Sequence, residues 1–248
     1  MRHPGADFGT LAARERIVAG ISPRYRGGLH FLGLLAQAAV FLGAAAWWLR
    51  DVRPREWLLV PAALVFANGV EWLVHRGPLH HAWTPRLAYQ RHTLTHHAAF
   101  SESDMSMRSW REMRIVLFPL YALPALLLLV APVAALLGWA GGRNAAALFM
   151  VASVLYYLLY ELLHLAYHLP AGHRLARSRL VGWLRRQHQR HHDPRRMTEG
   201  NFNVSIPLFD WLLGTRLSDQ REGTGVRDVA PSAHSASAEE SGAAQTIS

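Results

Sequence analysis

Residues 145–168 read AAALFMVASVLYYLLYELLHLAYH, and this stretch decides the fold class of the chain. A helix needs about 20 mostly apolar residues to cross a bilayer, and the apolar run continues almost to Glu161. The last turns carry His164 and His168, which are four residues apart. Because residues at this spacing share one face of a helix, both imidazoles can bind one metal ion. The stretch therefore predicts a membrane-spanning helix with metal ligands at one end.

Three further segments are long and apolar enough to span a membrane, at about residues 29–49, 57–75 and 115–139. The last of these contains Pro119, Pro124 and Pro132, which predict kinks because proline lacks a backbone N–H. With residues 145–168 as the fourth span, the sequence predicts an all-α integral membrane protein with four transmembrane helices.

The distribution of arginine predicts the orientation of these helices. The N-terminal stretch, residues 76–114 and the chain after residue 168 are rich in arginine, whereas the links within each pair of spans are short. Cytoplasmic segments carry the excess of positive charge in membrane proteins. Both termini are therefore expected in the cytoplasm, together with a cytosolic, histidine-rich helical cap that carries the active site.

The composition excludes several classes of site. The 248 residues include no cysteine, which excludes disulfides, thiolate zinc sites, iron–sulfur ligation and a cysteine nucleophile. All 26 basic residues are arginine, which together with the many alanines and glycines indicates a bacterial source and hence a bacterial inner membrane. The net charge of +9 comes from arginines that flank the apolar segments, without a nucleic-acid-binding motif, so no nucleic-acid partner is expected.

The chain divides into three parts. Residues 1–28 are expected to form a cytosolic N-terminal segment, residues 29–217 a membrane domain, and residues 218–248, which are rich in Ser, Ala and Gly, a disordered tail. Within the membrane domain, residues 174–192 are predicted to form an interfacial helix that ends before Pro194.

Ten of the fifteen histidines form four clusters at metal-ligand spacing. The clusters are His75 and His80; His92, His96 and His97; His164 and His168; and His188, His191 and His192. Imidazole binds iron, copper, zinc and nickel well, and ten imidazoles exceed what one ion can hold. The clusters therefore predict two metal ions with ligands from several helices.

In the segment after the second span, the identity of one metal ligand remains undecided. Arg76-Gly77-Pro78 is expected to break the helix, with Pro78 opening the next one, so that a following histidine turns back toward the site. Either His80 or His81 could fill this position, and the spacing favours His80. Four isolated histidines are interpreted as surface or core residues instead: His3, His30, His173 and His234.

Glu71 and Glu161 each stand one turn before a histidine cluster. A carboxylate can be a metal ligand, but with ten imidazoles available we favour a supporting role, in which each glutamate accepts the N–H of a ligand histidine. Alternatively, each side chain reaches water or pairs with an arginine. Asn201 receives a similar supporting role, at the start of an amphipathic segment, residues 201–215, that is expected to pack the cap onto the membrane domain.

Together these elements resemble the fatty acid hydroxylase/sterol desaturase superfamily over about residues 30–217. The matching elements are Glu71-Trp72-x2-His75, Arg91-His92-x3-His96-His97, His164-x3-His168, His188-x2-His191-His192, and the closing segment from Asn201-Phe202 to Gly214-Thr215. Each element alone is weakly specific, but the combination is highly specific.

The resemblance implies a dimetal centre, taken as two iron ions, ligated by the ten clustered histidines. It also implies O2-dependent oxidation of a C–H bond in a membrane lipid, which can be fatty acyl, sphingolipid or sterol-like. By ligand type alone, zinc could substitute for iron. The chain has neither a dinucleotide-binding glycine motif nor iron–sulfur ligands, so an external electron donor is expected, either a ferredoxin or a cytochrome with its reductase.

Other functions remain as alternatives to a lipid hydroxylase. A lipid or sterol desaturase, or a carotenoid oxidase, could use the same site. A metal transporter is a different class, but transporters place their ligands near the bilayer midplane, whereas these histidines lie at helix ends and in the cap. A metal with a purely structural role is the third alternative.

Overall fold

The computed structural model describes residues 8–83 and 86–217. The predicted tail and two of the isolated histidines, His3 and His234, lie outside these described residues. Within them the chain is helical and forms no strand, apart from one isolated antiparallel bridge between Ser101 and Asp104. The predicted all-α fold is confirmed.

Four helices are long and apolar enough to cross a membrane, as predicted. They are α2 (Gly27–Trp48), the continuous helix Pro54–Leu79, α6 (Ala122–Gly141) and α7 (Arg143–Tyr167). The second of these consists of η1 (Pro54–Leu58), α3 (Leu59–Val74) and η2 (His75–Leu79).

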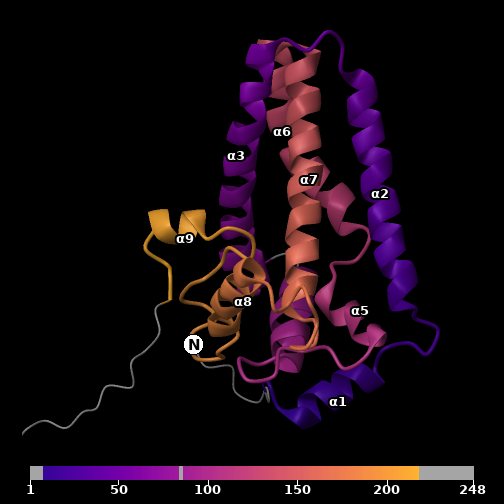
Figure 1. Ribbon diagram of the computed structural model, residues 1–248, viewed down its shortest axis with the longest axis vertical. Coiled ribbons are helices and arrows are strands. Elements are labelled where there is room, and N and C mark those ends of the chain that lie inside the picture. Colours follow the sequence, from indigo (N-terminus) through magenta and orange to yellow (C-terminus); the bar gives the residue numbers. More distant parts are fainter. Residues whose placement is uncertain (1–7, 84–85, 218–248) are drawn as a thin grey trace, which may run out of the picture. The chain divides into compact units, whose positions relative to one another are not determined.

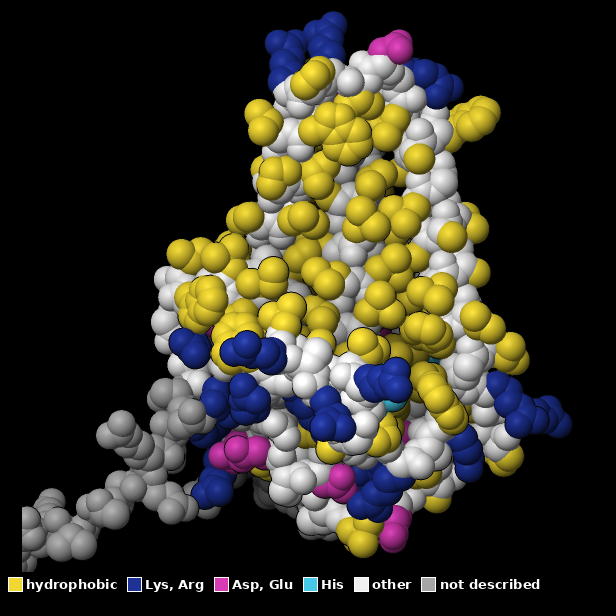
Figure 2. Space-filling view, viewed as in Figure 1, with side chains coloured by type: hydrophobic (Ala, Val, Ile, Leu, Met, Phe, Trp, Pro, Cys, Tyr) yellow, Lys and Arg dark blue, Asp and Glu magenta, His cyan; other side chains and the backbone are white. Residues whose placement is uncertain are grey.

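Helix α7 is the central helix of the bundle. It packs against α2, α3 and α6, as Figure 1 shows. In its most apolar part 61% of the residues are buried, against 11% in α2, so most side chains of α2 face outward. Figure 2 shows the hydrophobic side chains that cover the bundle, with arginines gathered at its two ends. This surface suits a bilayer, where apolar side chains face lipid and charged ones the interfaces.

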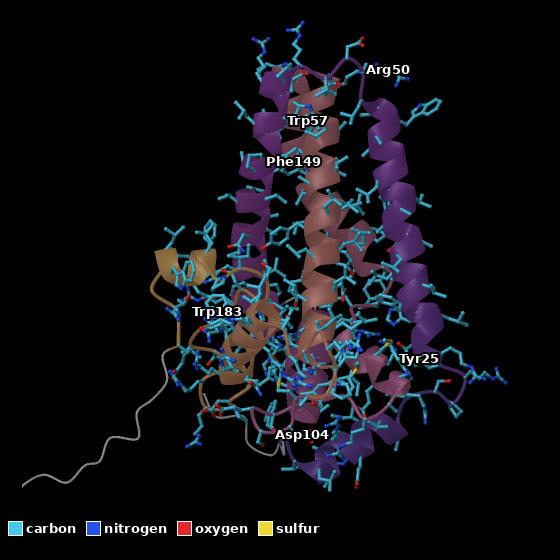
Figure 3. All side chains as sticks on the ribbon, in the orientation of Figure 1. Tyr25, Arg50, Trp57, Asp104, Phe149 and Trp183 are labelled. Atoms are coloured by element: carbon cyan, nitrogen blue, oxygen red, sulfur yellow. The ribbon has the colours of Figure 1, made fainter. Side chains whose placement is uncertain are left out.

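The remaining helices gather at one end of the bundle and form the cap (Figure 1). They are α1 (Leu11–Ala19), α4 (Arg86–Arg91), η3 (His92–His97), η4 (Trp110–Glu112), α5 (Met113–Val116), α8 (Arg179–His191) and α9 (Leu208–Leu212). In Figure 3, Tyr25, Asp104 and Trp183 lie toward the cap, whereas Arg50 and Trp57 lie at the opposite end. The bundle therefore carries the cap at one end, whereas the opposite end has only the short connections between membrane-spanning helices.

A buried arginine ties α1 to the rest of the cap. Arg14 is 2% exposed, and its guanidinium forms ion pairs with Glu112 and Asp104 and donates to the carbonyl of Ser106. A buried charge is stable only when it is paired in this way. The N-terminal segment therefore contributes a packed helix to the cap.

Two predicted helix starts were too early. The third span was expected from residue 115, but α5 ends at Val116 and α6 begins only at Ala122, because Leu117 is extended ahead of Pro119. The residue directly before a proline, here Phe118, is disfavoured in helical conformation, so no helix continues into Pro119. The interfacial helix was expected from residue 174, but α8 begins at Arg179, where the Ser178 hydroxyl accepts the N–H of Val181.

Candidate metal centre

The structure brings nine of the ten clustered histidines into two groups. The five-histidine group is His75, His80, His92, His97 and His191; the four-histidine group is His96, His168, His188 and His192. Within each group the potential ligand nitrogens lie within 4.8 Å of one another, and every member is buried. The tenth histidine, His164, is also buried and borders the second group, with its Nε2 3.2 Å from the Nε2 of His96.

The two groups are neighbours. The rings of His97 and His192, one from each group, stack with their centroids 4.1 Å apart. The arrangement therefore offers two adjacent positions for a metal ion in a single buried site, as two ions with histidine ligands require.

Two π-helical turns determine which of the two groups each histidine of the first two sequence clusters enters. The helix was expected to break at Pro78, but it continues through η2 as a π-helical turn that contains this proline. A π-turn closes between residues i and i+5 and so aligns residues five apart. Accordingly, His80 follows His75 into the five-histidine group. The same geometry in η3 brings His92 and His97 together, with their Nε2 atoms 3.1 Å apart, and sends His96 to the other group.

The histidines on α7 and α8 follow ordinary α-helical spacing. On α8, His188 and His192 are four residues apart and enter the same group, with their Nε2 atoms 3.1 Å apart. His191 points to the five-histidine group instead. One short helix thus supplies ligand candidates to both groups.

The structure also separates His80 from His81. His80 is 2% exposed and lies in the five-histidine group. His81 is exposed, its Nδ1 lies 2.8 Å from the carbonyl oxygen of Arg76, and its ring stacks on Trp83. Two of the isolated histidines, His30 and His173, likewise belong to neither group.

Backbone carbonyls fix the orientation and tautomer of five site histidines. The Nδ1 atoms lie at hydrogen-bonding distance from carbonyl oxygens, and the pairs are His75 with Phe202, His96 with Ile115, His168 with Met105, His191 with Gly200, and His192 with Phe100. A carbonyl can only accept, so each Nδ1 carries the proton. The lone pair of each neutral imidazole is therefore on Nε2.

His80 has the same tautomer for a different reason. The Thr93 hydroxyl donates to the carbonyl of Leu79, so its oxygen is left to accept the N–H of His80 Nδ1, which lies 3.3 Å away.

These tautomers leave Nε2 lone pairs facing each other. The Nε2 atoms of His80 and His191 are 2.9 Å apart, and those of His96 and His192 are 3.1 Å apart. Neither atom of either pair has a proton to donate in this tautomer. In addition, the buried Nε2 of His168 has no hydrogen-bond partner among the described residues. Converging lone pairs without donors are what a bound cation requires, so the donor set fits a metal centre.

Burial keeps the histidines of the cap neutral. It lowers the pKa of His191 to about 4. Burial, followed by the charges of neighbouring histidines, also lowers the pKa of His80, His92, His97 and His188 well below the ordinary value. Only the neutral imidazole can ligate a metal, so these positions are prepared for ligation at neutral pH.

The glutamates have partners other than those expected from the sequence. Glu71 accepts the backbone N–H groups of Val204 and Ser205, and Glu161 accepts the N–H of Phe118 and the hydroxyl of Tyr157. The predicted hydrogen bonds from site histidines to these carboxylates do not form within the described residues; backbone carbonyls accept the histidine N–H groups instead.

Asn201 is likewise placed among backbone groups. Its side chain donates to the carbonyl of Gln187 and accepts the N–H of Leu217, and its φ of +54° is a conformation that asparagine adopts more readily than most residues. It thereby holds the chain next to Gly200, whose carbonyl is the acceptor for His191.

Sequence reasoning missed the polar network that holds the segment after Asn201. The Asn68 amide donates to the hydroxyls of Tyr156 and Ser205, and Asp210 accepts the backbone N–H groups of Phe202 and Asn203. The signal for Asn68 was a single amide in an otherwise apolar span. Nothing in the sequence pattern marked the others.

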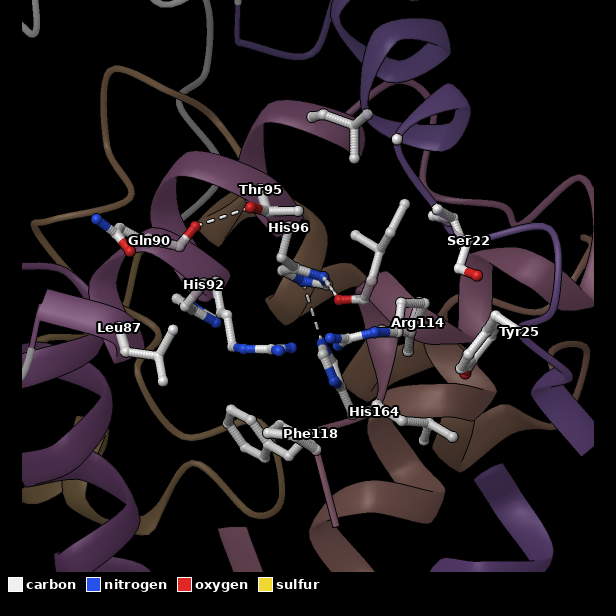
Figure 4. Close-up of a pocket in the computed structure, with 18 of the residues that line it drawn as sticks. Ser22, Tyr25, Leu87, Gln90, His92, Thr95, His96, Arg114, Phe118 and His164 are labelled. Atoms are coloured by element: carbon white, nitrogen blue, oxygen red, sulfur yellow. Dashed lines mark hydrogen bonds between the residues drawn. The ribbon is translucent and has the colours of Figure 1, made fainter. Parts of the chain in front are cut away.

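A cavity of about 670 Å³ leads to the histidines. Figure 4 shows His92, His96, Arg114 and His164 around it. Its volume lies in the range of small-molecule sites, about 300–1,000 Å³. The histidines can therefore be reached from outside through a defined space.

Comparison with known proteins identifies one match. A protein-family model described as fatty acid hydroxylase matches residues 60–215, which include more than half of the chain, all ten clustered histidines, both glutamates and Asn201. Among curated protein sequences and solved structures, none matches the chain.

Proposed function

Because this chain belongs to the fatty acid hydroxylase family, within the fatty acid hydroxylase/sterol desaturase superfamily, we propose that it is an O2-dependent membrane oxygenase that hydroxylates a C–H bond of a lipid. The observation that carries the proposal is the convergence of unprotonated imidazole nitrogens in the buried site. Its substrate is a fatty acyl, sphingolipid or sterol-like lipid.

The two groups would each hold one iron ion. The five-histidine group would hold the first, and the four-histidine group together with His164 the second. Bound there, two reduced iron ions would supply the electrons that activate O2. An all-imidazole donor set also accepts zinc, so metal analysis belongs to the test. The electrons would come from an external donor, a ferredoxin or a cytochrome with its reductase, because the chain has no cofactor motif of its own.

The residues around the ligands act by positioning. Glu71 would hold the segment that carries the Phe202 carbonyl, and so the ring of His75, in place. Glu161 would hold Phe118 at the wall of the cavity, and Asn201 would fix the turn that presents the Gly200 carbonyl to His191. Ligand rings held in one orientation need no rearrangement when the metal binds.

The arginine distribution supports a cytoplasmic position for the cap. Residues 76–114 and those after residue 168 carry many arginines, whereas the opposite end of the bundle has only short links. We infer an inner membrane protein of a bacterium, with both termini and the site on the cytoplasmic side.

The test combines lipid analysis with metal analysis. Cells with and without the gene are grown under 18O2, their lipids are compared by mass spectrometry, and the metal content of the purified protein is measured. Hydroxylation predicts a lipid that gains one 18O atom only when the gene is present. A lipid that gains a double bond without label would replace hydroxylation by desaturation, and an unchanged lipid profile would contradict an oxygenase.

Two histidine variants and a neighbouring control test the ligand assignment. His168→Ala and His192→Ala should each lose metal and product together. His81→Ala should keep both, because His81 is exposed and lies outside both groups. Full metal content in the first two variants would refute the assignment.

A further inference from the structure

Three arginines line the cavity with the site histidines, and two of them, Arg91 and Arg114, are half-buried, whereas Arg16 is exposed. Arg91 is the last residue of α4, and Arg114 lies in α5. Both line the cavity that also touches His92, His96 and His164. Both are half-buried, and in Figure 4 the Arg114 side chain points into the cavity. Their cationic groups are therefore next to the proposed reaction site.

No acidic side chain neutralises this pair. Among the described residues, neither arginine forms an ion pair, and no Asp or Glu lines the cavity. The Nε of Arg91 is buried and has no hydrogen-bond partner among the described residues. Arg14 differs, since that buried arginine has two carboxylates. The fold thus supplies carboxylates to the structural arginine, Arg14, but none to Arg91 and Arg114.

The two guanidinium groups repel each other in this position. Burial lowers the pKa of Arg114, and the charge of Arg91 is the next cause. Two like charges in a half-buried cavity are unfavourable unless an anion joins them. Planar guanidinium groups bind carboxylate and phosphate oxygens in two-pronged geometry.

Part of the cavity wall suits an apolar chain. Ile17, Ile21 and Phe118 line the same cavity as the arginines. A second cavity, of about 510 Å³, is also lined by Arg114 and includes Leu29 and Leu120, both exposed at the surface of the bundle. A lipid could therefore enter from the bilayer side and meet the arginines before the histidines.

We propose that Arg91 and Arg114 bind the anionic oxygen group, carboxylate or phosphate, of the lipid substrate and thereby select anionic over uncharged lipids. The proposal rests on the proposed function in one respect, namely that the bound lipid is the one oxidised. Positive charge near membrane spans is also explained by topology. Arg91 lies over the ring of Tyr121, but neither arginine has an acidic partner among the described residues. Topology does not explain why two arginines without a carboxylate face a cavity that ends at the histidines.

The test measures binding without turnover. The full-length protein, in nanodiscs of zwitterionic phosphatidylcholine, which has no net charge, is titrated under anaerobic conditions with pyrene-labelled hexadecanoic acid and with its methyl ester. Energy transfer from tryptophan reports bound probe. The wild-type protein should bind the acid at least about tenfold more tightly than the ester, since charge-assisted hydrogen bonds are lost in the ester. Equal affinity for acid and ester would overturn the proposal, and this comparison requires no variant.

Variants then assign the preference to the two arginines. Arg91→Gln and Arg114→Gln should each weaken acid binding by roughly tenfold and leave ester binding unchanged. The control is Arg86→Gln, on the same helix as Arg91, exposed and outside the cavity wall; it should keep the full preference. A preference that survives in the double variant would overturn the proposal.

Competitors distinguish the sources of the anion. A monoacyl phosphate lipid that displaces the acid probe supports the shared anionic chemistry, whereas displacement by inorganic phosphate alone, at equal concentration, would show that the site recognises a free anion and not a lipid. Because no product is measured, the outcome is independent of the proposed function. A protein that oxidises lipids but binds acid and ester equally would retain the function and lose this inference.

Discussion

Replacing Glu71 by glutamine is expected to destabilise the protein, because the groups that contact this carboxylate all donate to it. One carboxylate oxygen accepts the backbone N–H groups of Val204 and Ser205, and the other accepts the hydroxyls of Tyr156 and Ser205. The two hydroxyls also lie 2.5 Å from each other, so one can donate to the other, and at least one of their protons points to Glu71. The carboxylate is therefore the acceptor for two backbone N–H groups and at least one hydroxyl.

The size of the effect follows from these contacts. In Glu71→Gln, the amide oxygen can still accept the backbone N–H groups, but the NH2 group then faces the hydroxyls of Tyr156 and Ser205. One hydroxyl can still donate to the other, so the substitution leaves at least one buried donor without an acceptor, which costs about 1–3 kcal/mol. At roughly 2–4 °C per kcal/mol for a chain of this size, the unfolding temperature should fall by about 6 °C.

The assay is thermal unfolding of the purified protein in detergent, followed by circular dichroism. Glu102→Gln is the control, because Glu102 is an exposed acidic residue of the cap and should leave the temperature unchanged. Ser205→Ala removes one of the two hydroxyls, so it should cost less stability in the Glu71→Gln background than in the wild type. A fall of less than about 2 °C, or strictly additive effects, would refute the reasoning.

Acid should destabilise the metal-free protein. The pKa of His191 is lowered from 6.5 to about 4, so its stabilising contribution is complete above pH 6.5 and is lost as pH falls to about 4. The difference corresponds to roughly 3 kcal/mol for this residue, and unfolding temperatures of the chelator-treated protein between pH 7 and 4.5 measure it. An unfolding temperature of the metal-free protein that does not change with pH would contradict this prediction. Gly200→Ala should lower metal content and unfolding temperature, because its Cβ would lie 1.9 Å from the Thr215 carbonyl oxygen and shift the acceptor of His191. Gly172→Ala, where a Cβ meets nothing within 4 Å, is the control, and equal metal content in the two variants would contradict the prediction.

The membrane helices could be predicted because apolar length alone determines them. Each span is a run of about 20 apolar residues, and the only large error was the start of α6. There, residues 115–117 are apolar enough to continue a span, but they pack in the cap next to His96, whose Nδ1 lies 3.2 Å from the carbonyl oxygen of Ile115. Hydropathy cannot distinguish a lipid-facing residue from a buried residue of the cap.

The division of the histidines into two groups could be predicted only in part. On α8 the spacing of four residues gave the correct neighbours, His188 and His192, whereas at the end of α7 only His168 enters a group and His164 borders it. For the first two clusters, α-helical spacing would pair His92 with His96, whereas the π-turn pairs His92 with His97. A π-turn depends on tertiary packing and has no signature in the local sequence, and so this pairing required the structure.

The carboxylates and arginines around the site together determine its charge. Sequence spacing suggested that Glu71 and Glu161 contact the histidines, which would bring two negative charges to the metal ligands. Both carboxylates instead accept N–H or O–H groups of the surrounding helices and segments, while neutral carbonyls orient the histidine rings. Neutral ligands leave the full positive charge on any bound metal, and Arg91 and Arg114 add to it in the same cavity. A site with this charge distribution attracts anions from the surrounding interface, which is the physical basis for the preference for an anionic lipid.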